Sequence, residues 1–197
     1  IDKWLRNRGV NKDKRREVKA KFAISGRYID NKDGTVTDIY TNLQWMRCAV
    51  GEKWNGKNCV GKPTQLSQKE AAAFSKSYSF ASYRDWRVPN YKELSSLVNC
   101  SWGKDAVWIT QATGCASEIM EMDSNKHSYV YYSDKVLPPT IDVKAFPNSA
   151  HKAFWSSGLY DRGTGHIVSF NDGYNYGVDF NNKLRVRLVR KNYGFDF

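Results

Sequence analysis

The sequence is poor in the features that mark membrane proteins and enzymes. No apolar run reaches the roughly 18 residues that a membrane-spanning helix needs, so no membrane span is expected. Neither the HExxH spacing of zinc proteases nor the GxSxG turn of serine hydrolases occurs. The three histidines lie in unrelated contexts, at His127, His151 and His166. The residues therefore favour a binding domain over an enzyme, with no metal and no cofactor.

Cysteine is also scarce, and the four cysteines fall into two pairs. Cys48 and Cys59 are separated by 10 residues, and Cys100 and Cys115 by 14. Because these spacings differ from the CxxC pairs of zinc ribbons, we expect two sequential disulfides, each worth roughly 3 kcal/mol. Four cysteines allow three pairings, and reduced thiols are the alternative. Disulfides persist in oxidising surroundings, which predicts secretion, the cell surface or the periplasm.

The length and charge predict one domain with a basic extension. The 197 residues, 41% of them hydrophobic, can bury one substantial core. Of the net charge of +11, most lies in residues 1–27, which hold ten Lys or Arg against three Asp or Glu. Such an excess either attracts polyanions or forms a solvated face. We expect a basic N-terminal extension at 1–17 and a domain at 18–197.

Apolar and polar residues alternate in several segments, as they do in half-buried β-strands. Residues 18–24 alternate in this way and predict an early strand. Four more such segments follow in the last third of the chain, at 153–157, 166–170, 177–180 and 184–190. Because turns rich in Gly and Asn separate these four, they predict an antiparallel meander.

Two short helices are predicted from their first turns. Ser67 is followed three residues later by Glu70, and Asn90 by Glu93, which is the spacing of a capping box. Residues 101–147 lack a regular period and predict a long, partly ordered loop, the kind of segment that commonly carries recognition.

Four short motifs occur in one order along the chain. They are DGTVTD followed by LQW at 33–45, WRVP followed by a helix at 86–98, FWSS at 154–157 and VRLVR at 186–190. In this order they resemble the bacterial domain family named after the C-terminal domain of the Legionella collagen-like adhesin, over residues 27–190. The resemblance implies an α+β, C-type-lectin-like fold, an antiparallel sheet with two short helices and long loops, on a bacterial surface. In that fold the first and last strands pair, which would set 18–24 beside 184–190.

The same pattern is similar to the formylglycine-generating enzymes, which use a cysteine pair near the end of their domain. No cysteine follows Cys115 here, so their activity is not expected to transfer. C-type lectins hold Ca²⁺ with EPN-type and WND-type triplets. The segments 88–90 and 170–172 match these triplets only in part, and they are better explained as a helix cap and a turn.

The candidate binding residues are basic and aromatic, and they lie in the meander. Alternation places Arg185 and Arg187 on one face of the last strand, with apolar residues on the other. The full set is Arg162, Tyr174, Tyr176, Lys183, Arg185 and Arg187. Arginine and lysine can hold sulfate or carboxylate groups, and tyrosine adds flat contact area. The alternative is that these cations pair with Asp161, Asp172 and Asp179.

We therefore expect a secreted or surface-displayed adhesin domain that binds an extracellular ligand, with a polyanionic glycan as the favoured partner. Multimeric display would raise the apparent affinity of such weak sites. Three alternatives stay open: a protein-binding or sensory module of a bacterial envelope or pilus protein, an enzyme related to the formylglycine-generating group, and nucleic-acid binding through the basic extension.

Overall fold

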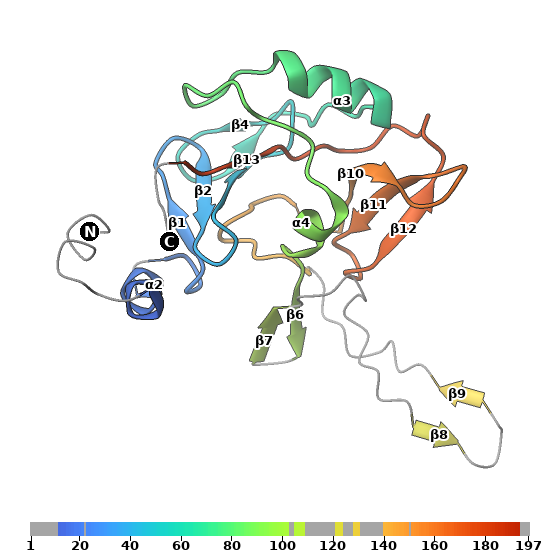
Figure 1. Cartoon of the computed structure of the whole chain (residues 1–197), viewed down its shortest axis with the longest axis horizontal. Coiled ribbons are helices and arrows are strands. Elements are labelled where there is room, and N and C mark those ends of the chain that lie inside the picture. The colour runs from blue at the N-terminus through green and yellow to red at the C-terminus, as the bar shows by residue number, and fades with distance from the viewer. Residues whose placement is uncertain are drawn as a thin grey trace.

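The computed structural model describes residues 12–21, 23–102, 105–108, 121–123, 128–130, 140–149 and 151–193. Short antiparallel strands and short helices make it an α+β protein, as predicted. Two main sheets lie at opposite sides of the view, and helix α3 (Gln68–Ser77) runs above them (Figure 1). No helix in the described ranges is long and apolar enough to cross a membrane.

The first sheet has the strand order β1-β2-β3-β13. Its strands are β1 (Tyr28–Asp30), β2 (Thr35–Asp38), β3 (Leu43–Met46) and β13 (Val189–Lys191). Asp33 starts β2 because its carboxylate accepts hydrogen bonds from the backbone N–H and the hydroxyl of Thr35, at 2.9 and 2.6 Å. Trp45 pairs with Val36 on one side and Val189 on the other, and it is fully buried. The motif at 33–45 therefore forms a hairpin that contains a buried tryptophan.

The second sheet is the predicted meander, with β10 (Ala153–Leu159), β11 (Gly165–Ser169) and β12 (Asn175–Val178) in sequence order. All its pairs are antiparallel. The register of β10 on β11 shifts between Trp155 and Leu159, which is a β-bulge. Within the shifted stretch, the Ser157 N–H donates to the Pro89 carbonyl at 2.7 Å, so β10 contacts the segment that precedes α4.

The predicted fourth strand of the meander is wrong. Residues 184–188 run between the two sheets, where Leu184 pairs with Leu66 and Arg185 with Phe154, before the chain enters the first sheet as β13. The N–H groups of Val50 and Met46 donate to the carbonyls of residues 186 and 188. Because elements cover both faces of this segment, the consecutive side chains of Val186, Arg187 and Leu188 are all buried.

Both predicted helices are confirmed, with their capping boxes. Helix α3 follows Ser67, and α4 (Tyr91–Ser95) follows Asn90; in each, the cap side chain accepts from the N3 backbone and the N3 glutamate accepts from the cap backbone. Helix α3 packs on β10, and α4 packs on β10 and β11.

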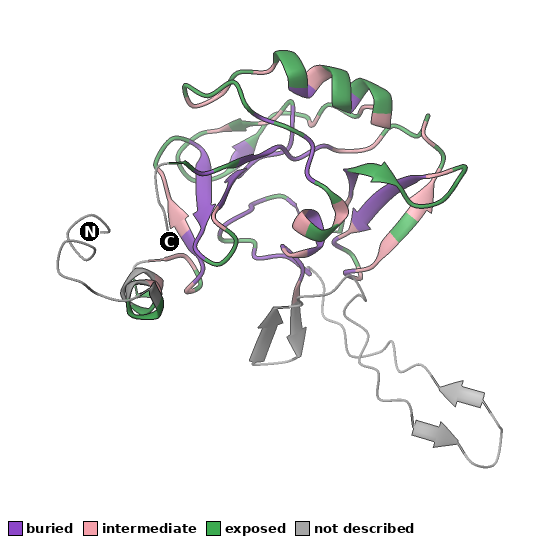
Figure 2. Cartoon of the chain, viewed as in Figure 1, coloured by how far each residue is buried: buried purple, intermediate pink, exposed green. Residues whose placement is uncertain are grey.

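The core has two clusters of buried apolar side chains. One joins the first sheet to α4 and β10 around Trp45, Leu94 and Phe154. The other lies beneath α3 around Trp86, Trp155 and Leu188. Burial is therefore concentrated on β2, β3, β11 and the segments that link the sheets (Figure 2). The three tryptophans of the family motifs, Trp45, Trp86 and Trp155, are core residues.

The disulfide between Cys48 and Cys59 is confirmed. It spans β4 (Lys53–Trp54), which pairs with β5 (Cys59–Val60). The predicted pair of Cys100 with Cys115 lies outside the described residues. Within the predicted long loop, β6 (Asn99–Trp102) pairs with β7 (Asp105–Trp108), and β8 (Glu121–Asp123) pairs with β9 (Ser128–Val130).

The predicted strand at 18–24 is wrong, because helix α2 (Lys12–Ala20) includes its first three residues and the described residues that follow form a turn, a bend and a single bridge. The helix has ion pairs with i,i+3 spacing, Lys14 with Glu17 and Asp13 with Arg16. Such pairs, together with good helix formers, favour a helix over the short alternation of apolar residues. Among the described residues of that segment, Ile24 makes a strand-like bridge, and its partner is Tyr28, not the last strand.

Candidate functional site

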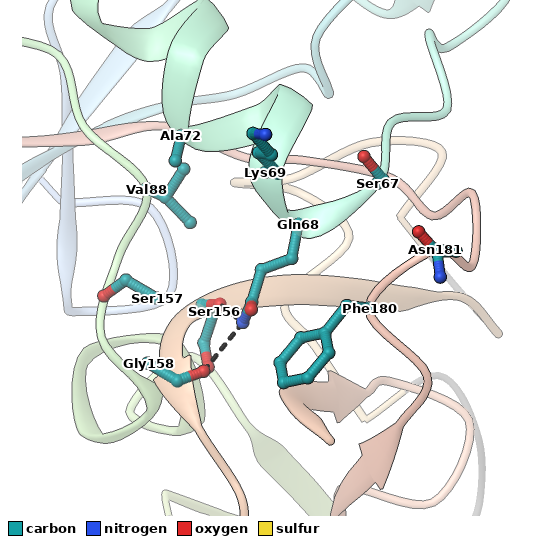
Figure 3. Close-up of a pocket in the computed structure, with 10 residues that line it drawn as sticks. All are labelled: Ser67, Gln68, Lys69, Ala72, Val88, Ser156, Ser157, Gly158, Phe180 and Asn181. Carbon is teal, nitrogen blue, oxygen red and sulfur yellow. Dashed lines mark hydrogen bonds between the residues drawn. The ribbon is translucent and has the colours of Figure 1, made fainter. Parts of the chain in front are cut away.

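A pocket opens between the start of α3 and the bulge of β10. At the bulge, the Gln68 side-chain amide donates to two carbonyls of β10, Ser156 O at 3.1 Å and Gly158 O at 2.7 Å (Figure 3). Gly165 leaves room for this contact, since a Cβ there would lie 2.9 Å from the Gln68 amide nitrogen and 2.8 Å from the Trp155 ring. The local sequence of both strands therefore fixes the pocket floor.

The turn after β12 forms the third side of the pocket, next to the start of α3 and the bulge of β10. The Gln68 N–H donates to the Phe180 carbonyl at 3.1 Å, and the Asp179 carboxylate accepts from the Asn181 N–H at 2.8 Å. These bonds hold Phe180 and Asn181 against the start of α3. This side of the pocket is thus attached to the helix by backbone contacts and does not depend on a mobile side chain.

The pocket has a volume of about 440 Å³, which lies within the range of small-molecule sites. Its lining residues are Ser67, Gln68, Lys69, Ala72, Val88, Ser156, Ser157, Gly158, Phe180 and Asn181. They supply hydroxyl and amide groups, one aromatic ring and one ammonium group, and no carboxylate. Figure 3 shows Lys69 and Asn181 above the floor, with the Phe180 ring beside Gln68.

Two lysines lie near the start of α3, and among the described residues one of them forms an ion pair whereas the other does not. Lys183 bonds Glu70, and that bond, together with those from Ser67, lowers the pKa of the Glu70 carboxyl to about 2. Glu70 therefore stays ionised and neutralises Lys183. Lys69, one residue earlier, is exposed and has no ion pair with any described residue. The pocket consequently carries one uncompensated positive charge.

A comparison with known protein families now assigns the chain. The family model described as the Lcl C-terminal domain matches residues 34–190, which is most of the chain. The chain belongs to the Lcl C-terminal domain family. Membership indicates a surface-associated bacterial domain, and the family match covers the meander, α3, α4, the pocket and most of the first sheet, though not β1. No curated protein matches the chain.

The structure of this Lcl C-terminal domain disperses the predicted binding residues. Arg162 is exposed in the turn between β10 and β11, and Lys183 is bonded to Glu70 beside the pocket. The Tyr176 hydroxyl donates to Asp172, and burial together with that bond raises the pKa of Tyr176 to about 12. The Tyr174 ring lies 6.3 Å from that of Tyr176. Only these two tyrosines are brought together.

The two arginines of the last predicted strand do not form a basic face. Arg185 is half-buried and donates to the Asn148 carbonyl at 3.3 Å. Arg187 is fully buried, so the prediction that it faces solvent is wrong. Its guanidinium donates to the carbonyls of Met46 and Arg47 and to the Ser149 hydroxyl. Burial lowers the pKa of Arg187 to about 9.

The predicted alternative, pairing of these cations with the meander aspartates, is also absent from the described ion pairs. Asp161 instead accepts from the Gly163 N–H and the Thr164 hydroxyl, at 2.9 and 2.8 Å, and Asp172 accepts from the Tyr174 N–H at 3.0 Å. Both carboxylates therefore stabilise turns. Asn90, which belongs to the partial match with a lectin triplet at 88–90, caps α4.

The described part of the Lcl C-terminal domain holds no group of three or more His, Cys, Asp or Glu side chains that could bind a metal. The pocket residues Gln68, Lys69, Phe180 and Asn181 were not predicted from sequence. They come from two segments more than a hundred residues apart. The one local signal is that Gln68 and Lys69 directly follow a helix cap, where side chains begin to project from a fixed backbone.

Proposed function

We propose that this Lcl C-terminal domain is a C-type-lectin-like recognition domain that binds an acidic glycan in the pocket between α3 and β10, without chemical turnover. The observation that carries the proposal is the pocket lining, in which hydroxyl and amide groups surround one unpaired ammonium group and one aromatic ring. Hydroxyl and amide groups match the hydroxyls of a sugar, and Lys69 matches an acid group. Phe180 offers a flat apolar surface to the ring.

The rigidity of the pocket supports binding by a preformed site. Its floor is fixed by the two hydrogen bonds of Gln68, and its helix begins with a complete capping box. A site whose side chains are already ordered loses less entropy on binding. A single such pocket still makes few contacts, so an adhesin would raise its apparent affinity by displaying several copies.

Competition binding tests this function. The immobilised domain is titrated with heparin, polygalacturonate, neutral dextran and duplex DNA. We expect the acidic polysaccharides to bind and dextran not to bind, with Lys69→Gln weakening them about tenfold, because loss of a charge-assisted hydrogen bond costs at least 1.4 kcal/mol by order of magnitude.

Lys76→Gln is the matched control. Lys76 is an exposed lysine in the last turn of the same helix, outside the pocket lining, and its substitution removes the same charge. Equal weakening by both variants would show that only net charge matters and would reject the pocket. Equal binding of dextran would reject an acidic ligand.

A protein partner is the second candidate, and one observation favours it. Leu159 and Tyr160 are adjacent at the end of β10 and are 64% and 50% exposed. Exposed apolar residues that adjoin each other favour protein contacts over water. If no acidic glycan binds the displayed domain, Leu159→Ser is the variant that tests binding to a protein of the cell envelope.

A further inference from the structure

A second group of side chains, all but one of them exposed, lies where the chain leaves the first sheet. It consists of Tyr83, Arg87, Arg190, Lys191 and Tyr193, which we call the C-terminal cluster. None of these residues lines the pocket at α3. Tyr193 is 70% exposed, the highest value among the exposed large hydrophobic residues of the described chain, and Tyr83 is 38% exposed.

The backbone that carries Tyr193 is held in place. The N–H of Asn192 donates to the Asn42 carbonyl at 3.1 Å, and the Asn42 side-chain amide donates to the Asn192 carbonyl at 3.2 Å. The turn between β2 and β3 therefore binds the segment that follows β13. Because this backbone is already ordered, less entropy is lost when a ligand binds the tyrosine that it carries.

Arg190 orders the aromatic rings of the cluster. Its guanidinium carbon lies 3.7 Å from the centroid of the Tyr83 ring and 5.9 Å from that of Tyr193. It also donates to Asp85 at 2.7 Å and to Gln44 at 2.6 Å, and it is only 4% exposed. Arg190 is thus a positioning residue that is itself inaccessible to a ligand.

The cluster keeps one cation for a ligand. Arg87 forms a two-bond contact with Glu93, at 2.7 and 2.6 Å, and Arg190 is neutralised by Asp85. Hydrogen bonding to Glu93 raises the pKa of Arg87. The backbone of Arg87 pairs with Val189, which places this ion pair beside the last strand. Lys191 is exposed, has no ion pair with any described residue, and lies 5.7 Å from the Tyr193 ring.

We propose that the C-terminal cluster is a second binding site for acidic sugar, separate from the pocket, in which Tyr193 stacks on the sugar ring and Lys191 binds its acid group. The ligand class rests on the proposed function, whereas the site rests on the cluster itself. Tyrosine suits this role because its ring packs on an apolar face while its hydroxyl stays in water. Two sites on one domain would let it join two segments of polysaccharide.

Single-stranded nucleic acid is the rival ligand, and the charges disfavour it. Sites of that kind combine a positively charged groove along the backbone with successive aromatic platforms. Here two of three cations are neutralised by carboxylates, which leaves one ammonium group for a chain with a charge on every phosphate. One acid group on a sugar matches this single charge.

Calorimetric titration of the whole chain with trigalacturonate tests the proposal. We expect two sites per chain. Tyr193→Ala and Lys191→Gln should each remove one site, or weaken it about tenfold, and leave the other unchanged. Lys69→Gln should weaken the other site alone. Tyr176→Ala, which changes another exposed tyrosine in the meander, is the matched control and should leave both sites intact.

The outcomes separate this proposal from the proposed function. One site, lost in Lys69→Gln and unaffected by the two cluster variants, would overturn the second site and leave the pocket standing. One site that is lost in the cluster variants but unaffected by Lys69→Gln would overturn the pocket and leave the C-terminal cluster standing. If an oligo-dT of ten nucleotides binds the cluster more tightly than trigalacturonate does, the ligand class is wrong. Thermal unfolding of each variant confirms that it is folded.

Discussion

Arg187 is held in the core by neutral groups. Its guanidinium contacts two backbone carbonyls and a serine hydroxyl, and it lies 4.8 Å from the Phe146 ring and 5.3 Å from the Phe154 ring. These contacts replace water around a charge whose burial is otherwise unfavourable, which is also why its pKa falls. The residue therefore joins β3, residues 140–149 and the segment between the sheets.

We expect Arg187→Ala to lower the free energy of unfolding by about 3 kcal/mol, because it leaves buried carbonyls unpaired and a cavity between rings. Arg185→Ala, two residues earlier and half-buried, should change it by about 0.5 kcal/mol or less. Urea unfolding of the two variants measures the difference. Equal effects would contradict the structural role that we assign to Arg187.

Sequence alternation could not have separated these two arginines. A period of two distinguishes the faces of a strand that has one face in water. Residues 184–188 have an element on each side. Val186 and Arg187 are therefore both fully buried, although their side chains point to opposite faces of the segment. Which elements cover a segment is a long-range property, and the pocket residues were missed for the same reason.

At the scale of elements, sequence signals that act within one helical turn were sufficient to predict the helices α3 and α4. The capping boxes at Ser67 and Asn90 predicted both helices correctly, since cap and glutamate are three residues apart. The helix at Lys12–Ala20 has no such cap in its described part, and its ion pairs compete with an apolar alternation that predicts a strand. The wrong prediction arose where two local signals disagreed.

The start of α3 should make stability depend on pH. Glu70 has an ordinary pKa of 4.5 and a pKa of about 2 in the folded chain, because Lys183 and Ser67 bind the ionised form. The folded state therefore releases this proton more readily than the unfolded state does. Its stabilising contribution is complete above pH 4.5 and is lost as the pH falls toward 2.

Glu70→Gln tests this dependence. We expect the variant to have a lower melting temperature than the wild type at pH 7, with the gap closing at pH 2. Both side chains of the ion pair are about half exposed, so the gap is small and shrinks in high salt. Lys183→Gln, which keeps the capping box, should lose only part of the effect. A gap that is constant with pH would refute the assigned cause.

At the scale of the whole molecule, the Cys48–Cys59 disulfide joins the loop after β3 to β5, and residues 140–149 contact the chain beside it. The Asn148 side-chain amide donates to the Cys59 carbonyl at 2.5 Å, and Arg187 binds the carbonyl next to Cys48. Residues 140–149 in turn contribute Phe146 to the core of the first sheet. The disulfide thus stabilises a contact between segments that lie far apart in sequence.

Replacing Cys48 and Cys59 together by serine should lower the free energy of unfolding by roughly 3 kcal/mol, or the melting temperature by about 6 to 12 °C.

The same double variant tests the predicted pairing of Cys100 with Cys115. If this second disulfide exists, a reducing agent will destabilise the double variant further, because the Cys100–Cys115 bond also restricts the unfolded chain. If reductant changes the wild type but not the variant, the Cys48–Cys59 bond accounts for the whole redox effect and the second pairing is wrong. Asn148→Ala is the control that measures the loop contact alone, and we expect it to cost no more than about 1.5 kcal/mol.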